Sequence, residues 1–179
     1  MGHEHEHEIE ISISDLDASG RDFAFPVRGA WVRGALEGHE ATSTGRDGSL
    51  ARRASKSGTD VVLRGHLEVV LVTPCARCLE PVTFGVDEEI SWLMVPRSAY
   101  RDPGPGEHEL AALDADTSPY DGDTVVLDDL VRDELVLATP MIPLCSEDCP
   151  GMSPAREGRD GAGVDPRLLP LLQIKLEKP

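Results

Sequence analysis

Aromatic residues are scarce in this sequence, at 4% of the chain, so its core must be built from valine, leucine, isoleucine and alanine. Cations are also in short supply, because 17 Lys and Arg stand against 33 Asp and Glu and give a formal charge of −16. A field of that sign opposes non-specific attraction to nucleic acid and to anionic membranes. It favours solubility or a basic partner.

Membrane, export and catalytic signatures are missing from the sequence as well. No apolar run approaches the roughly 20 residues that a membrane-spanning helix needs, and no charged-then-apolar export signal opens the chain. There is no GxGxxG, P-loop, HExxH or GxSxG pattern, and local spacing assembles no nucleophile, base and orienting group. We therefore expect a cytoplasmic, non-enzymatic protein with no membrane contact and no small-molecule substrate.

The length of the chain favours one domain. Residues 3–8 alternate His and Glu, so that residues 1–8 are typical of an engineered affinity tag, with a natural His-rich metal tract as the alternative. Residues 9–176 are predicted to form a single β-rich α+β domain with a long hairpin, one main helix and a cysteine zinc knuckle. Within it, the polar segments 38–58 and 96–123 are predicted to be loops and 151–166 to be flexible, while the apolar residues in 168–176 can dock on the body.

Strands are predicted where apolar residues alternate or cluster. Ile9, Ile11 and Ile13 alternate with polar residues, and residues 23–32 can form a second strand, which Pro26 places at an edge. Residues 60–72 are rich in β-branched side chains and predict a strand buried on much of both faces. Residues 82–94 carry apolar side chains at even positions, interrupted by Glu88, and predict its hairpin partner.

Residues 125–138 predict a short strand or helix entry followed by a helix, which Pro140 ends. One stripe of this helix is apolar, formed by Leu127, Leu130, Val131, Leu135 and Ala138. We expect the stripe to pack on the face of the sheet that carries Val82, Phe84, Ile90 and Trp92.

The four cysteines form two tight pairs, which are Cys75 with Cys78 and Cys145 with Cys149. Two such pairs supply the four sulfurs of a closed tetrahedral zinc site, and this is the favoured interpretation. A redox dithiol at Cys75 and Cys78 is the second, although thioredoxin-like motifs begin a helix and this pair follows a strand. Inert buried thiols are the third.

Other chemistry-bearing residues have ordinary structural interpretations. His66 lies within a strand pattern and is predicted to be a packed or surface histidine. Trp31 and Trp92 are predicted to belong to the core. Carboxylates along the predicted helix are expected to form a solvated face, comprising Asp128, Asp129, Asp133 and Glu134.

The segment 74–81 (PCARCLEP) and the segment 127–151 (LDDLVRDELVLATPMIPLCSEDCPG) together resemble the YceD family, which is named for accumulation of large-subunit ribosomal RNA. The resemblance extends over about 60–176, and residues 9–59 fit it only loosely. Many members of that family carry a further cysteine pair after the second one. In this sequence the corresponding residues are Met152-Ser153-Pro154-Ala155-Arg156, which include no cysteine. This difference leaves open whether Cys145 and Cys149 share one site with Cys75 and Cys78.

The resemblance implies a non-catalytic ribosome biogenesis factor that supports accumulation of large-subunit (23S) ribosomal RNA. Its implied partner is that RNA or a basic ribosomal protein, and the charge of −16 favours the protein. Direct RNA contact would need a local basic face, for which the candidates are Arg52, Arg53, Lys56, Arg64, Arg77, Arg97 and Arg101. The alternative function is a thiol-disulfide oxidoreductase that uses Cys75 and Cys78.

Overall fold

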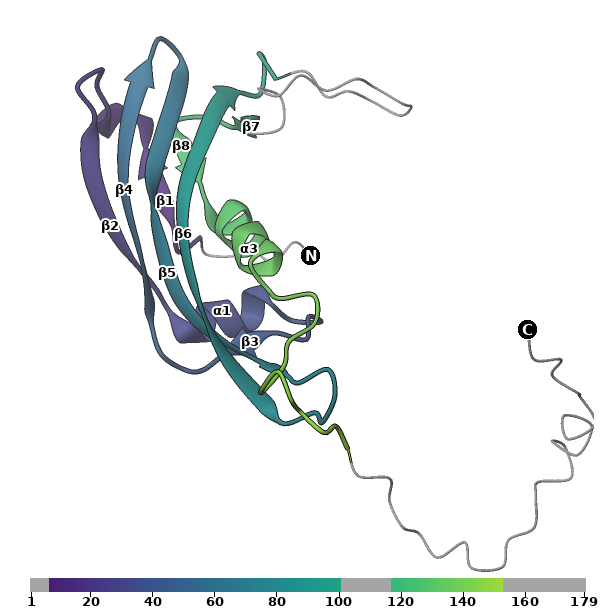
Figure 1. The fold of residues 1–179 in the computed structure, drawn as a ribbon. Coiled ribbons are helices and arrows are strands. Elements are labelled where there is room, and N and C mark those ends of the chain that lie inside the picture. The colour runs from purple at the N-terminus through teal and green to yellow at the C-terminus, as the bar shows by residue number, and fades with distance from the viewer. Residues whose placement is uncertain (1–6, 101–116, 153–179) are drawn as a thin grey trace, which may run out of the picture.

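A computed structural model describes residues 7–100 and 117–152 of the chain (Figure 1). Its main sheet has the strand order β2-β4-β5-β6-β7, and β3 is paired with one end of β5. All pairings in it are antiparallel except that of β7 with β6. The strands of this sheet are β2 (Arg21–Val27), β3 (Thr42–Ser43), β4 (Gly48–Ser57), β5 (Asp60–Pro74), β6 (Pro81–Pro96) and β7 (Thr117–Tyr120).

A smaller layer covers the sheet. It contains a two-stranded antiparallel ribbon, a one-turn 3-10 helix and two α-helices, and Figure 1 shows α1 and α3 on the concave side of the main sheet. These elements are β1 (Glu10–Ser12), η1 (Ile13–Asp15), α1 (Gly29–Ala35), β8 (Thr124–Val126) and α3 (Asp128–Leu137). A β-rich α+β fold is thus confirmed. Among the described residues, no helix combines the length and the apolar character that a bilayer crossing requires.

The predicted long hairpin is confirmed as β5 and β6, which pair from Val61 with Met94 to Pro74 with Pro81. Burial alternates along both strands, so the covered face of the sheet carries fully buried residues such as Leu63 and Leu67. The opposite face of β5 is half-buried or exposed. The prediction that this strand is buried on much of both faces is therefore wrong, because helices cover only one side of the sheet.

Helix α3 packs its apolar stripe against the covered face of the sheet, as predicted from the sequence. Val131 and Leu135 are fully buried in the same cluster as Ile90 and Trp92, and Leu130 is partly buried against it. The Trp92 indole N–H also donates to a Glu134 carboxylate oxygen at 3.2 Å, which fixes the helix over β6. The prediction that both Trp92 and this stripe belong to the core is confirmed.

The prediction of a loop over residues 38–58 is wrong. Ten of its residues form β4, which lies inside the sheet between β2 and β5, and Thr42–Ser43 form β3. Its covered face does alternate, but through Leu50, Arg52 and Ala54, so a charged and a small residue stand where large apolar ones signal a strand. The polar outer face of β4 is simply solvent-exposed.

The predicted strand over residues 23–32 ends at Val27, and α1 follows it. Two long-range contacts hold this glycine-containing helix. The Asp47 carboxylate accepts the Gly29 backbone N–H at 2.9 Å, and the Arg132 guanidinium donates to the Ala35 carbonyl at 2.9 Å. Helix formation here depends on tertiary partners, because glycine disfavours helices. The predicted edge position of Pro26 is confirmed, since β2 is the edge strand.

Four predicted segments lie partly or wholly outside the described residues. Of the loop predicted over 96–123, residues 101–116 are outside, and Thr117–Tyr120 is strand β7 rather than loop. Most of the flexible segment 151–166, all of 168–176 and most of the His-Glu start are also outside.

Candidate metal centre

The first cysteine pair forms the tip of the β5–β6 hairpin. The Cys75 backbone N–H donates to the Glu80 carbonyl at 2.8 Å, and the Leu79 N–H donates to the Cys75 carbonyl at 3.0 Å. Leu79 has a φ of 65°, the only positive φ of a non-glycine residue in the described chain. These two bonds and the left-handed residue curl the tip so that Cys78 returns to the side of Cys75.

The second pair lies on the segment that leaves α3, which runs down to the hairpin tip in Figure 1. The Ala76 N–H donates to the Pro143 carbonyl at 2.8 Å and joins the two segments backbone to backbone. A turn follows, in which the Cys149 N–H donates to the Ser146 carbonyl at 3.1 Å. This turn brings Cys145 and Cys149 to the same point.

All four sulfurs lie within 4.8 Å of one another. The shortest separations are 3.8 Å from Cys75 Sγ to Cys149 Sγ and 3.6 Å from Cys78 Sγ to Cys145 Sγ, and none of the four cysteines is in a disulfide. Four zinc–sulfur bonds of about 2.3 Å in a tetrahedron place their sulfurs about 3.8 Å apart. The two shortest separations therefore match those around one shared tetrahedral cation, and the other sulfur pairs lie no more than 4.8 Å apart.

Backbone amides point at the most buried sulfur. Cys75 Sγ accepts the N–H of Arg77 at 3.5 Å and that of Cys145 at 3.4 Å. The Arg77 N–H, then those of Cys145 and Cys78, lower the pKa of the Cys75 thiol to about 6. Such amide–sulfur bonds stabilise a thiolate and fix its direction.

Cys78 and Cys145 resist ionisation beside Cys75. At Cys78 the Glu80 amide lowers the pKa, but burial and the neighbouring sulfurs outweigh it and raise the value to about 12. The neighbouring Cys149 sulfur likewise raises the pKa of Cys145. Without a cation, four clustered sulfurs cannot all carry negative charge, because like charges at this distance disfavour one another.

Arg77 clamps the second turn from outside. Its guanidinium donates to the carbonyls of Glu147 at 3.2 Å and Cys149 at 3.0 Å, while its own carbonyl accepts the Met152 N–H at 3.1 Å. Arg77 therefore helps to assemble the cysteine cluster, and its charge is already directed at protein oxygens.

The family described as large ribosomal RNA subunit accumulation protein YceD matches residues 63–175. The chain belongs to the YceD family. It is also similar to uncharacterized proteins of Mycobacterium bovis and of two Mycobacterium tuberculosis strains, at 26% identity over 132 residues in each case. These alignments cover 70% of this chain and 60% of each relative, so the chain spans less than two thirds of the relatives that it matches. No solved structure matches the chain.

YceD membership supports a ribosome-related role and confirms the resemblance drawn from the cysteine and helix motifs. The match includes both cysteine pairs and α3, and it begins within β5. The site assembled above thus lies inside the part of the chain that defines the family.

Most of the cations that could form a basic face for RNA are already bound to other groups of the protein or buried. Arg53 pairs with Asp22 at 3.0 Å, and Arg97 pairs with Asp121 at 2.8 Å. Arg52 is buried at 4% exposure, so the prediction that it belongs to a basic surface is wrong. Arg101 lies outside the described residues, which leaves Arg64 and the half-buried Lys56.

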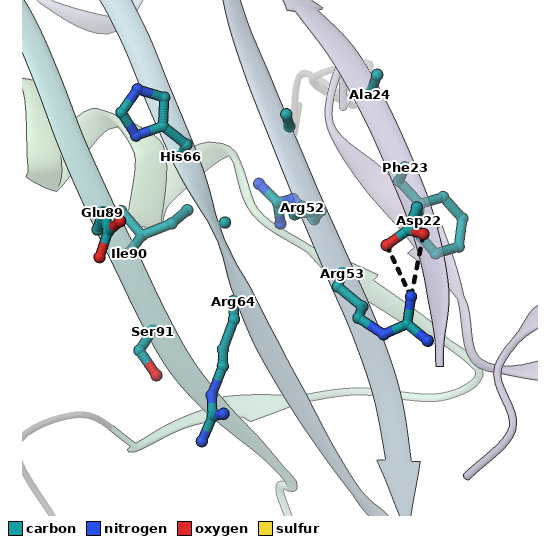
Figure 2. A pocket seen from close by; sticks show the side chains of 12 residues that line it. Asp22, Phe23, Ala24, Arg52, Arg53, Arg64, His66, Glu89, Ile90 and Ser91 are labelled. Carbon is teal, nitrogen blue, oxygen red and sulfur yellow. Dashed lines mark hydrogen bonds and ion pairs between the residues drawn. The ribbon is translucent and has the colours of Figure 1, made fainter. Parts of the chain in front are cut away.

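Three of these arginines, Arg52, Arg53 and Arg64, line a shallow hollow of about 1000 Å³ on the uncovered face of the sheet. Figure 2 shows Arg53 paired with Asp22 on one side of the hollow, and Arg64 beside Ser91 on the other, with Glu89 farther along the same strand as Ser91. The charges in the hollow are of mixed sign. It offers no continuous track for a phosphate backbone, which is bound chiefly by neutralising cations.

A second cluster on this face was not foreseen from the sequence. His66 Nε2 lies 3.3 Å from a Glu68 oxygen and 2.9 Å from an Asp87 oxygen. The available signal was the hairpin register, which sets Glu68 opposite Asp87, with His66 two residues away on the same face. The side chains are half-buried or exposed, and His66 is a surface histidine as predicted.

The carboxylates of α3 are only partly the solvated face that was predicted. Asp129 and Asp133 are exposed. The Asp128 carboxylate, however, accepts the backbone N–H groups of Glu8 and Ile9 at 3.1 and 3.2 Å and ties β1 to the helix. Glu134 accepts the Trp92 N–H, as described above.

Arg52 gives a stability prediction. Its guanidinium lies 5.7 Å from the Phe25 ring and 5.4 Å from the Trp92 ring, and all three nitrogens are buried without a hydrogen-bond partner. Burial lowers the pKa of Arg52 to about 10. Because the charge is desolvated and unpaired, Arg52→Met should raise the free energy of unfolding in urea by about 1–4 kcal/mol.

Arg53→Met is the matched control, since Arg53 is exposed on the adjacent position of the same strand. Exposed ion pairs contribute about 0–1 kcal/mol, so this variant should change stability little. A loss of stability in Arg52→Met larger than that in Arg53→Met would contradict the assignment of an unfavourable buried charge.

Proposed function

We propose that this chain is a non-catalytic factor that supports the accumulation of large-subunit ribosomal RNA. One zinc ion, held by Cys75, Cys78, Cys145 and Cys149, would stabilise its structure. The observation that carries the proposal is the YceD match over a region in which four sulfurs converge within 4.8 Å. A four-sulfur set is a closed site with no open coordination position, which is typical of structural rather than catalytic zinc.

The partner is more readily a basic ribosomal protein than bare RNA. Three arginines that could contact phosphate are paired or buried, and the chain carries a charge of −16. Affinity for RNA comes largely from phosphate neutralisation. Ribosomal partners of opposite charge are instead attracted to an acidic surface. This function places the protein in the cytoplasm, where cysteines remain reduced.

A thiol oxidoreductase is the competing function, and the lowered pKa of Cys75 favours it. Two observations weigh against it. Cys75 is fully buried, and the pair lies at the tip of a β-hairpin rather than at the start of a helix. Reversible cycling of Cys75 between thiol and disulfide, with no zinc bound, would support this alternative.

The proposed function predicts a cellular phenotype. Deletion of the gene in the source organism should lower mature large-subunit RNA relative to small-subunit RNA, measured by quantitative electrophoresis of total RNA. The wild-type chain supplied in trans should restore the ratio, and Cys75→Ser should not, because it removes a zinc ligand. An unchanged ratio in the deletion strain would refute the function.

A further inference from the structure

Exposed apolar side chains gather at the cysteine end of the molecule. The described residues include five large hydrophobic side chains that are exposed, and they lie on the hairpin tip or on the stretch from the last residue of α3 to just after the second cysteine turn. They are Leu79 at 63%, Leu137 at 79%, Met141 at 99%, Ile142 at 71% and Met152 at 63%. Single exposed apolar residues are ordinary, but such a concentration is typical of an interaction site.

A shallow groove continues this surface. It has a volume of about 230 Å³ beside the hairpin tip, and Val72, Pro74, Leu79 and Pro81 line it, with Glu40 among the polar lining. We call the five exposed side chains and this groove the knuckle surface. The groove provides the concave element into which an aliphatic side chain can be inserted.

The knuckle surface is also acidic. Glu80, Glu147 and Asp148 are exposed there, and the guanidinium of the adjacent Arg77 is bound to backbone carbonyls. With zinc in place, four thiolates on one divalent cation leave a net negative centre beneath it. Charge of this sign repels RNA phosphates, anionic lipid and a second copy of the same surface.

We infer that the knuckle surface binds a cationic protein segment that carries aliphatic side chains among its lysines and arginines. The inference rests on the proposed function and identifies the face through which the protein would engage a basic ribosomal protein. Aliphatic side chains of the partner cover Ile142, Met141 and the groove at Leu79, while its cations face Glu80 and Glu147. Both features are needed, because charge steers the encounter and buried apolar anchors hold the complex.

Cross-linking identifies the occupant. A photoreactive amino acid replaces Met141 in the full chain in the source organism, and the cross-linked species are identified by mass spectrometry after irradiation. A cross-link to a basic large-subunit protein is the expected result. Cross-links to a second copy, to residues 153–179 of the same chain or to RNA would overturn the inference, and so would the absence of any cross-link.

Affinity measurements with that purified ribosomal protein then test the surface. Ile142→Asp should raise Kd at least tenfold at 0.15 M salt, because it removes an apolar anchor. Ser91→Asp adds the same charge on the uncovered face of the sheet and should change Kd less than twofold. Glu147→Lys should likewise weaken binding by more than Glu89→Lys. Zinc content and thermal unfolding confirm that each variant is folded, and equal effects of surface and control variants would overturn the inference.

The ratio of mature large-subunit RNA to small-subunit RNA tests this inference and the proposed function separately. If deletion lowers large-subunit RNA but Ile142→Asp restores it fully, the knuckle surface is refuted and the function stands. If deletion leaves the ratio unchanged, the function fails, while cross-linking and the two Kd comparisons still decide whether the surface binds a cationic protein.

Discussion

Cys75→Ser is expected to abolish zinc binding and to lower the free energy of unfolding by more than about 4 kcal/mol, a loss that marks removal of a metal site. Cys75 is fully buried and its sulfur accepts two backbone N–H bonds, one from each cysteine segment. The wild-type chain, freed of residues 1–8, should carry one zinc. Elemental analysis and urea unfolding, each with and without a chelator, measure both quantities.

Ala76→Ser is the matched control for this experiment. Ala76 is exposed in the same turn. It contributes to the contact between the two segments through its backbone N–H and not through its side chain. The variant should retain zinc and stability, because serine keeps that N–H. Full zinc retention by Cys75→Ser, or a wild-type chain indifferent to the chelator, would exclude a zinc centre formed by all four sulfurs.

Leu135→Ala is expected to lower the free energy of unfolding by roughly 2–5 kcal/mol, because it opens a cavity between α3 and the sheet. Leu135 is 0% exposed, whereas Leu137, two residues later on the same helix, is 79% exposed. Leu137→Ala should therefore change stability by less than about 0.5 kcal/mol. Equilibrium unfolding in urea measures both variants.

The loss in free energy of unfolding for Leu130→Ala should lie between the losses for Leu135→Ala and Leu137→Ala, because Leu130 is only partly buried against the core. Equal losses from Leu135→Ala and Leu137→Ala would contradict the packing of α3 on the sheet. The expected order of loss is thus Leu135 first, Leu130 second and Leu137 last, which follows the area each side chain removes from water.

The hairpin, α3 and the convergence of the cysteines could be predicted because each is recorded in a short and regular pattern. Alternating apolar residues define β6, and a 3.6-residue stripe defines α3. The cysteine spacings indicate two turns of the chain. That the turns meet could be inferred only from the chemistry of a four-ligand site, and the sulfur separations agree with that inference.

Strand β4 and helix α1 could not be predicted because their stability depends on neighbours. The covered face of β4 contains Arg52, whose charge hides the alternation, and its position depends on pairing with β5 along nine consecutive residues from Ser49 to Ser57. Helix α1 depends on Asp47 and Arg132, which lie elsewhere in the sequence. Local propensity is overridden in both cases by contacts that a short window does not contain.

The positive charge available at the surface also could not be predicted from the sequence. Seven cations could be named from the sequence as a possible basic face, but composition does not show which of them are already paired. The structure turns Arg77 toward backbone carbonyls and Arg52 toward two aromatic rings. The usable positive surface is therefore smaller than the sequence suggests.

The pairing of β1 with β8 has a consequence for the order of events during synthesis. Ile11 lies opposite Val125, so β1 cannot pair until β8, the last described strand, has been synthesised. At about 5–20 residues per second, roughly 6–23 s separate the translation of these two positions. Throughout that interval Ile9 and Ile11 lack their partner strand, and once β6 is complete the covered face of the β5–β6 hairpin still lacks α3. Apolar surface that stays exposed during synthesis favours aggregation, so the late arrival of β8 and α3 is the step at which this chain is most exposed to it.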